Sequence, residues 1–465
     1  MSDEPGASTG PVAGSGRFRA EVRDWLRAHV PARPLPSVDT AEGFAAHREW
    51  EHELAAARLS VVSWPVAYGG RDAPLLDWLV FEEEYYAAAA PVRVGQNGLF
   101  LLAPTLFAHG TAEQLDRVLP PMATADEVWA QAWSEPDAGS DLAAIRATAT
   151  AADGGWLLSG TKTWSSRAAF ADKAFGLFRS EPGAQRHRGL TYLMFDLRAP
   201  GVTVRPIRQL GGRTGFAEIF LDQVFVPAAD VIGEPGDGWR VAMSTAGHER
   251  GMSLRSPGRF SAAAARLVEL WRQAGDPADT VLRDRVVDAW IGARAYRLHT
   301  HAAAARLAAG GSLGAESSLG KVFWSELDVA LHETALDLLG PYAELASPKP
   351  DGDPGLAGDW GQAEEPGLAG STELAGDPEA GGNPGLAGSA GLAGDPEEHG
   401  NAGLAGDPEA HGNAGLAGDL ALDGDAGLAG RWLDGYLFSL AGPIYAGTNE
   451  IQRTVIAERL LGLPR

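Results

Sequence analysis

Trp133-Ser-Glu-Pro-Asp-Ala-Gly-Ser-Asp141 is a turn-rich stretch at the point where the hydrophobic pattern of the chain changes. Before it, from residue 17 to about 129, apolar side chains recur at helical spacing. After it, as far as Val226, short apolar runs punctuated by Gly and Pro predict strands. Beyond Gly238 the helical spacing returns.

This order of helices, strands and helices predicts an α+β fold. We expect a helical N-terminal domain over 1–129, a small central β domain over 130–237 and a C-terminal helical bundle over 238–465. No Gly-x-Gly-x-x-Gly motif follows a strand, which argues against a doubly wound dinucleotide fold.

A low-complexity insert interrupts the predicted bundle between residues 347 and 430. Residues 351–430 hold 22 of the 60 glycines, 16 acidic residues and no Lys or Arg. Gly-Leu-Ala-Gly recurs there at multiples of six residues, which leaves a stacked solenoid as an alternative. Because the repeat has so few apolar residues to offset the entropy of ordering, we predict a disordered Gly/Asp/Glu-rich insert.

Composition excludes several classes of function. The formal charge of −23 argues against a protein that binds nucleic acid or an anionic membrane. The chain has no cysteine, so it has no disulfide, thiolate metal site or cysteine nucleophile, and no metal site is predicted. Neither an apolar run long enough to cross a bilayer nor a signal peptide is recognisable, so we expect a cytoplasmic protein.

Four short motifs are candidates for chemistry, each with a plainer structural alternative. In 133–141, small residues allow close backbone approach to an anionic or heteroaromatic ligand, or form an ordinary loop. In Thr161-Lys-Thr-Trp164-Ser-Ser166, the indole lines an aromatic cofactor or belongs to the core. Tyr445-Ala-Gly-Thr-Asn-Glu-Ile-Gln-Arg453 opens a helix, which suits a phosphate or simple capping. Glu249 beside Arg250 is a functional carboxylate or half of a solvated ion pair.

The order and spacing of these motifs resemble the acyl-CoA dehydrogenase family of flavoproteins. The stretches 133–141 and Gly160–Ser166 are similar to its two flavin signatures, and 445–453 to its C-terminal signature. Further similarities lie outside these three motifs: Trp64-Pro-Val-Ala-Tyr-Gly-Gly70, Gly110-Thr-Ala-Glu-Gln114 and the strand Phe216–Pro227.

The resemblance implies FAD between the β domain and the C-terminal bundle. The flavin would contact Trp133 and Ser134 through hydrogen bonds, Trp164 through its ring and Ser166 at its N5 edge. The resemblance also implies that the FAD phosphates or adenosine contact Gly447, Thr448 and Glu450. The thioester substrate would bind at Ser140, Arg250 and Ala446.

The chain departs from the commonest pattern of the family at the catalytic base. Many members carry a Glu in a Tyr-Glu-Gly-Thr turn, where this chain has Ala446, which cannot take a proton. A minority, like the isovaleryl-CoA and long-chain enzymes, place the Glu before an Arg on a helix of the C-terminal domain. Glu249-Arg250 matches that place, so Glu249 is the expected base.

A second departure concerns assembly. The Arg-x-x-Phe-Gly motif that many relatives use to reach the partner's FAD is not reproduced by Pro257-Gly-Arg-Phe-Ser261, which leaves Arg255, Arg259 or another Arg as the substitute. The resemblance still implies a homodimer or homotetramer, or a hetero-oligomer, with an electron-transfer flavoprotein as electron acceptor.

Three functions are compatible with these residues. The first is an FAD-dependent α,β-dehydrogenase acting on an acyl-CoA or a carrier-bound acyl thioester. The second is an oxidase or monooxygenase on the same scaffold, since a fold does not fix a reaction. The third is a non-catalytic subunit that binds FAD or acyl groups, an alternative that Ala446 and the insert keep open.

Overall fold

A computed structural model describes residues 12–249, 256–311, 313–344 and 422–464. Most of the predicted insert therefore lies outside the described residues, as do Arg250 and Arg255. The described part of the insert differs from expectation, because α10 (Leu422–Ser439) begins before the predicted end of the insert at residue 430.

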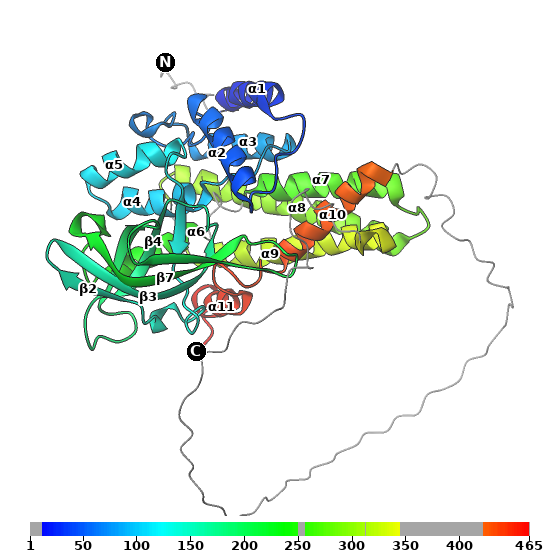
Figure 1. The fold of residues 1–465 in the computed structure, drawn as a ribbon. Coiled ribbons are helices and arrows are strands. Elements are labelled where there is room, and N and C mark those ends of the chain that lie inside the picture. The colour runs from blue at the N-terminus through cyan, green and yellow to red at the C-terminus, as the bar shows by residue number, and fades with distance from the viewer. Residues whose placement is uncertain (1–11, 250–255, 312, 345–421, 465) are drawn as a thin grey trace, which may run out of the picture. The chain divides into compact units, whose positions relative to one another are not determined.

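The N-terminal region is helical, as predicted (Figure 1). It contains α1 (Val12–His29), α2 (Ala41–Ala56), α3 (Leu75–Ala87), α4 (Ala103–His109) and α5 (Ala112–Ala123), and a π-helical turn, η2 (Gly98–Leu102), leads directly into α4. The start of α5 is closed by a reciprocal capping box. The Gln114 amide N–H donates to Thr111 Oγ1 at 3.2 Å, and the Thr111 amide donates to Gln114 Oε1 at 3.0 Å.

The middle region forms one eight-stranded mixed sheet in the order β6-β7-β3-β2-β4-β5-β8, with β1 paired to β4. The strands are β1 (Trp129–Ala132), β2 (Thr148–Ala152), β3 (Gly155–Ser166), β4 (Lys173–Arg179), β5 (Leu190–Asp196), β6 (Val202–Ile207), β7 (Phe216–Pro227) and β8 (Val231–Ile232).

Side chains alternate between the two faces of a strand, and a core cluster covers each face of the central strands. On β4, Phe175 and Leu177 join the core cluster shared with the N-terminal helices and α6 (Gly238–Glu249), whereas Phe178 belongs to the cluster on the opposite face. One face of the sheet therefore packs against α6, the helix that ends at Glu249.

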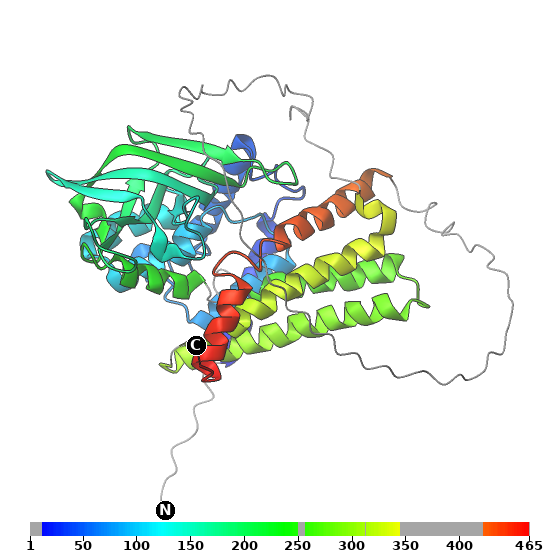
Figure 2. The same cartoon turned by 90° about the horizontal axis from the view of Figure 1, so that it is seen from below.

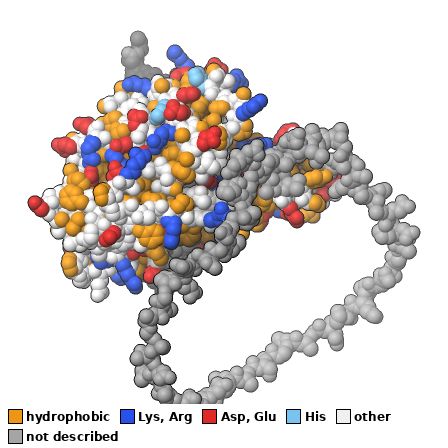
Figure 3. Space-filling view, in the orientation of Figure 1, with side chains coloured by type: hydrophobic (Ala, Val, Ile, Leu, Met, Phe, Trp, Pro, Cys, Tyr) orange, Lys and Arg blue, Asp and Glu red, His pale blue; other side chains and the backbone are white. Residues whose placement is uncertain are grey.

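The C-terminal region continues with long helices that pack around a third core cluster (Figure 2). They are α7 (Pro257–Ala274), α8 (Thr280–Ala308), α9 (Glu316–Leu339) and α10, and the short helix α11 (Asn449–Val455) follows them. The periodicity predicted α8 over Thr280–Ala308, which is confirmed. None of the described helices is both long and apolar enough to cross a membrane. Figure 3 shows acidic and basic side chains interspersed on one face.

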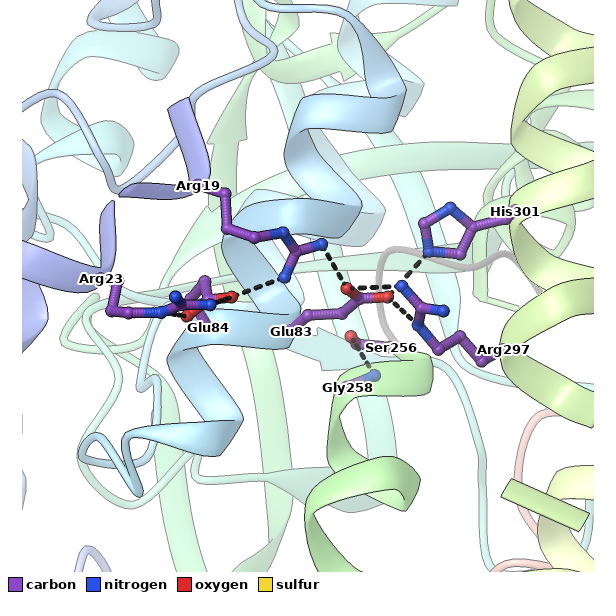
Figure 4. Close-up of polar contacts among 8 residues, drawn as sticks. All are labelled: Arg19, Arg23, Glu83, Glu84, Ser256, Gly258, Arg297 and His301. Carbon is purple, nitrogen blue, oxygen red and sulfur yellow. Dashed lines mark hydrogen bonds and ion pairs between the residues drawn. The ribbon is translucent and has the colours of Figure 1, made fainter. Parts of the chain in front are cut away.

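Glu83 on α3 connects the N-terminal helices to the bundle (Figure 4). Its carboxylate accepts hydrogen bonds from Arg19 of α1 at 2.7 Å, and from Arg297 and His301 of α8 at 3.1 and 2.8 Å. Burial alone would raise the pKa of Glu83, but these three donors lower it well below its usual range. The carboxylate is thus charged and holds three helices together.

Glu82, the preceding residue, is in the opposite electrostatic situation. Its side chain is buried, and burial is the main cause that raises its pKa to about 8. Arg93 opposes the shift, but its Nε donates to Glu51 Oε2 at 2.7 Å, so the guanidinium already has a buried counterion. Glu82 is therefore protonated at neutral pH.

The raised pKa of Glu82 makes the stability of the folded protein depend on pH, and Glu82→Gln should remove this contribution. The pKa of Glu82 is raised in the folded state, so its contribution is full below the unfolded value of about 4.3 and is lost as pH rises toward 8. The free energy of unfolding of the variant should gain on wild type by up to about 1.4 kcal/mol per pH unit in this window. Denaturant titrations from pH 5 to 8 test this, and a constant difference would contradict it.

A glycine fixes the contact between α3 and α7. A Cβ at Gly258 would lie 2.7 Å from the Glu82 carbonyl oxygen, so Gly258→Ala should destabilise the protein by about 1–3 kcal/mol through overpacking. The matched control is Gly320→Ala on α9, where a Cβ meets nothing within 4 Å and should stabilise by about 0.5–1 kcal/mol. Thermal midpoints of both variants measure the two effects, and equal shifts would refute the packing argument.

Candidate functional site

A β-bulge in β3 brings Trp164 to the surface. Lys162 pairs with Ile219 and Ser165 with Ala217, so one extra residue is inserted between them on β3. Trp164 lies in this bulge with φ of 58°, and 58% of it is exposed. The alternative that Trp164 is a core residue of the strand is therefore wrong, because the bulge breaks the in–out alternation that would have buried it.

The first signature lies beside this bulge. The Thr163 amide donates to the Ser134 carbonyl at 2.8 Å, and Lys162 Nζ donates to the Trp133 carbonyl at 3.3 Å. The structure thus brings the segment with Trp133 and Ser134 alongside the strand with Trp164 and Ser166. These residues, about thirty positions apart in the chain, share one surface.

A buried ion pair holds the two signatures in register, and neither partner was predicted as a site residue. Lys162 is fully buried and its Nζ lies 2.9 Å from Glu135 Oε1. Glu135 also accepts the backbone N–H groups of Arg146 and Ala147 at 2.6 and 2.9 Å. Burial lowers the pKa of Lys162, and Glu135 opposes that shift. Glu135 lies inside the first signature and Lys162 inside the second, so their opposite charges were the sequence signal from which this ion pair could have been predicted.

The far end of the first signature is open to solvent. Ser140 is exposed, and Asp141 pairs with Arg186 at 2.9 Å on the surface, where both side chains are more than half exposed. Exposed pairs of this kind contribute only about 0–1 kcal/mol. The stretch is therefore anchored at Glu135 and accessible at Ser140, which suits a loop that a ligand approaches.

Glu249 is the last residue of α6. Its backbone belongs to the helix, whereas its side chain and the following Arg250 lie outside the described residues. The preceding turn of α6 is buried at Ala242, Thr245 and Ala246. The structure thus places the Glu249 backbone at the end of a helix that packs against the sheet.

The C-terminal signature forms a turn whose carbonyl groups are held by one side chain. Ala446 and Gly447 both have positive φ, at 57° and 76°, and Gln452 Nε2 donates to their carbonyls at 3.0 and 3.3 Å. Thr448 caps α11 by accepting from the Ile451 amide at 3.3 Å, so the capping interpretation holds.

Contacts with α9 anchor this turn to the bundle. Lys321 Nζ donates to Asn449 Oδ1 at 2.7 Å, and both residues are buried. Glu450, next in the chain, is exposed on the first turn of α11. A hydrogen bond from its own backbone N–H, with one from Thr448, lowers the pKa of the Glu450 carboxyl.

Arg259 is engaged within the bundle. Its Nη2 donates to Asp328 Oδ2 at 2.7 Å, and Asp328 is 1% exposed. The guanidinium also lies over the rings of Phe260 and Phe438. Of the two arginines considered for reaching a partner's cofactor, Arg259 is therefore committed to its own chain.

Comparisons with known proteins agree with this arrangement. Family models for the N-terminal, middle and C-terminal domains of acyl-CoA dehydrogenases match residues 15–126, 130–224 and 236–349. The acyl-CoA dehydrogenase IpdE1 of Mycolicibacterium smegmatis is 35% identical, over 96% of this chain and 97% of its own length.

Solved structures share the fold at lower identity. The Tcur3481-Tcur3483 steroid ACAD superposes with a TM-score of 0.73 at 21% identity, covering 100% of this chain and 99% of its own. The prolyl acyl carrier protein oxidase AnaB superposes with a TM-score of 0.66 at 17% identity, covering 98% of this chain and 100% of its own. Together with the three family models and the IpdE1 match, these likenesses establish that the chain belongs to the acyl-CoA dehydrogenase family of flavoprotein oxidoreductases.

Proposed function

We propose that this protein catalyses FAD-dependent α,β-dehydrogenation of an acyl thioester, with Glu249 as the base. The observation that carries the proposal is the exposed indole of Trp164, presented by a bulge beside the Trp133–Ser134 segment. A flat exposed ring next to a Gly/Ser-rich loop fits a flat heteroaromatic cofactor.

The residues proposed to bind FAD come from three segments. Trp133 and Ser134 offer backbone and hydroxyl groups, Trp164 offers its ring, and Ser166 lies at the end of β3. The turn of the C-terminal signature adds Gly447, Thr448 and Glu450, whose place in the family pattern is at the FAD phosphates or adenosine. Bound FAD supplies a two-electron acceptor for the hydrogen that leaves Cβ of the acyl group.

A base on α6 is proposed because the C-terminal turn has Ala446 where many relatives carry a Glu. Ala446 has no side chain that takes a proton, whereas Glu249 ends the helix that packs on the sheet. Glu249 takes the α-proton, the Cα–Cβ bond becomes double, and the product is the enoyl thioester. The backbone N–H of Ala446 donates to the thioester oxygen and polarises it, which makes the α-proton more acidic.

The substrate enters over the exposed end of the first signature. Ser140 and Arg250 are proposed to bind the thioester, which is an acyl-CoA or an acyl group on a carrier protein. IpdE1 supports the first, as its name is that of an acyl-CoA dehydrogenase. An electron-transfer flavoprotein is the proposed acceptor of the electrons.

We also propose that the chain works as an oligomer. The bundle exposes large apolar side chains on α8 and α9, including Trp290 (47%), Ile291 (51%) and Phe323 (42%). Apolar surface of this kind commonly marks an interface. A homodimer, a homotetramer or a hetero-oligomer would cover it, and the Tcur3481-Tcur3483 steroid ACAD is named for two different chains.

An oxidase is the second candidate, and one comparison favours it. AnaB, a prolyl acyl carrier protein oxidase, has the same fold as this chain. A non-catalytic FAD- or acyl-binding subunit is the third candidate, since Ala446 lacks a functional side chain.

Replacing the base tests the proposed mechanism directly. Glu249→Gln should lower the rate of anaerobic flavin reduction by an acyl-CoA by at least about 10²-fold, because general-base catalysis contributes that much. Flavin content should be unchanged. The control is Glu269→Gln, an exposed carboxylate on α7, which should behave as wild type. Reduction by Glu249→Gln at the wild-type rate would disprove the assignment.

Absorbance spectra distinguish the three functions. The purified protein should be yellow, and acyl-CoAs of increasing chain length should bleach it anaerobically, with slow recovery in air. Rapid peroxide formation would instead identify an oxidase. A protein that stays colourless with added FAD would identify the non-catalytic subunit.

A further inference from the structure

A chain of buried hydrogen bonds runs from the first signature to the helix of Glu249. Trp133 Nε1 donates to Tyr192 Oη at 3.0 Å, and Tyr192 Oη lies 3.3 Å from Thr245 Oγ1 on α6. Thr245 Oγ1 is 2.8 Å from Thr105 Oγ1 on α4, and Thr105 donates to the Leu101 carbonyl at 2.7 Å. Five residues from four regions of the fold are thereby linked.

Only the two end groups of this series of hydrogen bonds have fixed roles. An indole N–H only donates and a carbonyl only accepts. The Thr105 hydroxyl donates to the Leu101 carbonyl, and the Thr245 hydroxyl has two acceptors, Thr105 Oγ1 at 2.8 Å and the Val241 carbonyl at 3.2 Å. Tyr192 Oη accepts from Trp133 and lies 3.3 Å from Thr245 Oγ1, a contact in which either hydroxyl can donate.

Burial makes the chain costly to break. Thr105, Tyr192 and Thr245 are all 0% exposed, so water does not replace a lost partner. Hydrogen bonds in series also polarise and strengthen one another in such an environment. The chain therefore constrains α6 from both sides, through β5 on one and through α4 and its π-helical turn on the other.

Thr245 stands four residues before Glu249, which is one helical turn along the same face of α6. Between them, Gly247 meets nothing within 4 Å of a built Cβ and contributes weakly to helix stability. The hydrogen bonds of Thr245 thus add a directional contact to the apolar packing of Val241, Ala242 and Ala246 that holds α6.

We propose that Thr245, held between Tyr192 and Thr105, is a positioning residue that fixes the turn of α6 carrying Glu249 relative to the flavin-binding segment at Trp133. This inference rests on the proposed function, in which Glu249 is the base. One network of hydrogen bonds then sets the position of Glu249 relative to the segment proposed to bind flavin.

The test compares Thr245→Val, which keeps the shape and removes the hydroxyl, with Thr245→Ser, which keeps the hydroxyl. Thr334→Val is the matched control, because Thr334 is equally buried and donates to the carbonyl four residues back on its own helix. Flavin content and thermal midpoint of each holoenzyme establish that it is folded.

Two readouts follow. In anaerobic reduction by a saturating acyl-CoA, Thr245→Val should be about 10–10²-fold slower, with substrate Kd within about threefold, since a misplacement near 1 Å has that effect. In amide hydrogen exchange of the protein without substrate, the peptide covering α6 should exchange at least about tenfold faster in Thr245→Val. Thr245→Ser should restore both, and Thr334→Val should change neither.

The outcomes separate this inference from the proposed function. Wild-type reduction rate or wild-type exchange of α6 in Thr245→Val would overturn the positioning role. A wild-type protein that no acyl-CoA reduces would overturn the dehydrogenase proposal instead, while the exchange comparison would still decide whether Thr245 anchors α6.

Discussion

Two of the segments proposed to bind FAD, those around Trp133 and Trp164, both depend on the buried ammonium of Lys162. A charge removed from water is tolerated only with a counterion and further hydrogen bonds, and Lys162 has both in Glu135 and the Leu177 carbonyl. Glu135 in turn orders the loop after it by accepting two backbone N–H groups. Removing one partner of such a pair typically costs about 3–5 kcal/mol. The loop of the first signature is therefore fixed to β3 next to the bulge that exposes Trp164.

Adjacent residues on α3 show how one helix serves two environments. Glu82 and Glu83 are rotated by about 100° around the helix axis, so they face different neighbours. Glu83 meets cations from α1 and α8 and stays charged, whereas Glu82 faces the interior and is neutral at pH 7. The charged residue joins the N-terminal helices to the bundle, and at the backbone of the same two residues the missing Cβ of Gly258 allows α7 to approach closely.

Local patterns predicted most of the elements but not how they meet. Helical periodicity located α8, and the Thr111–Gln114 spacing identified a capping box, because both signals lie within a few residues. The local pattern left Trp164 open between a core position and a cofactor-lining position, since a bulge is set by pairing with a distant strand. Contacts such as Arg297 with Glu83 join residues 214 positions apart, and no local pattern encodes them. The commitment of Arg259 to Asp328 was hidden for the same reason.

The conformation of the C-terminal turn explains how the base can stand elsewhere. Ala446 has a positive φ although it is not glycine, and the Gln452 side chain holds the carbonyls of the turn. The turn thus depends on its backbone and on Gln452, not on the side chain at position 446. Thr245, on the same helix as Glu249, instead belongs to the hydrogen bonds that reach Trp133. Under the proposed function, the base on α6 is thereby linked to the segment proposed to bind flavin, whereas a base on the C-terminal turn would be linked to α9 of the bundle.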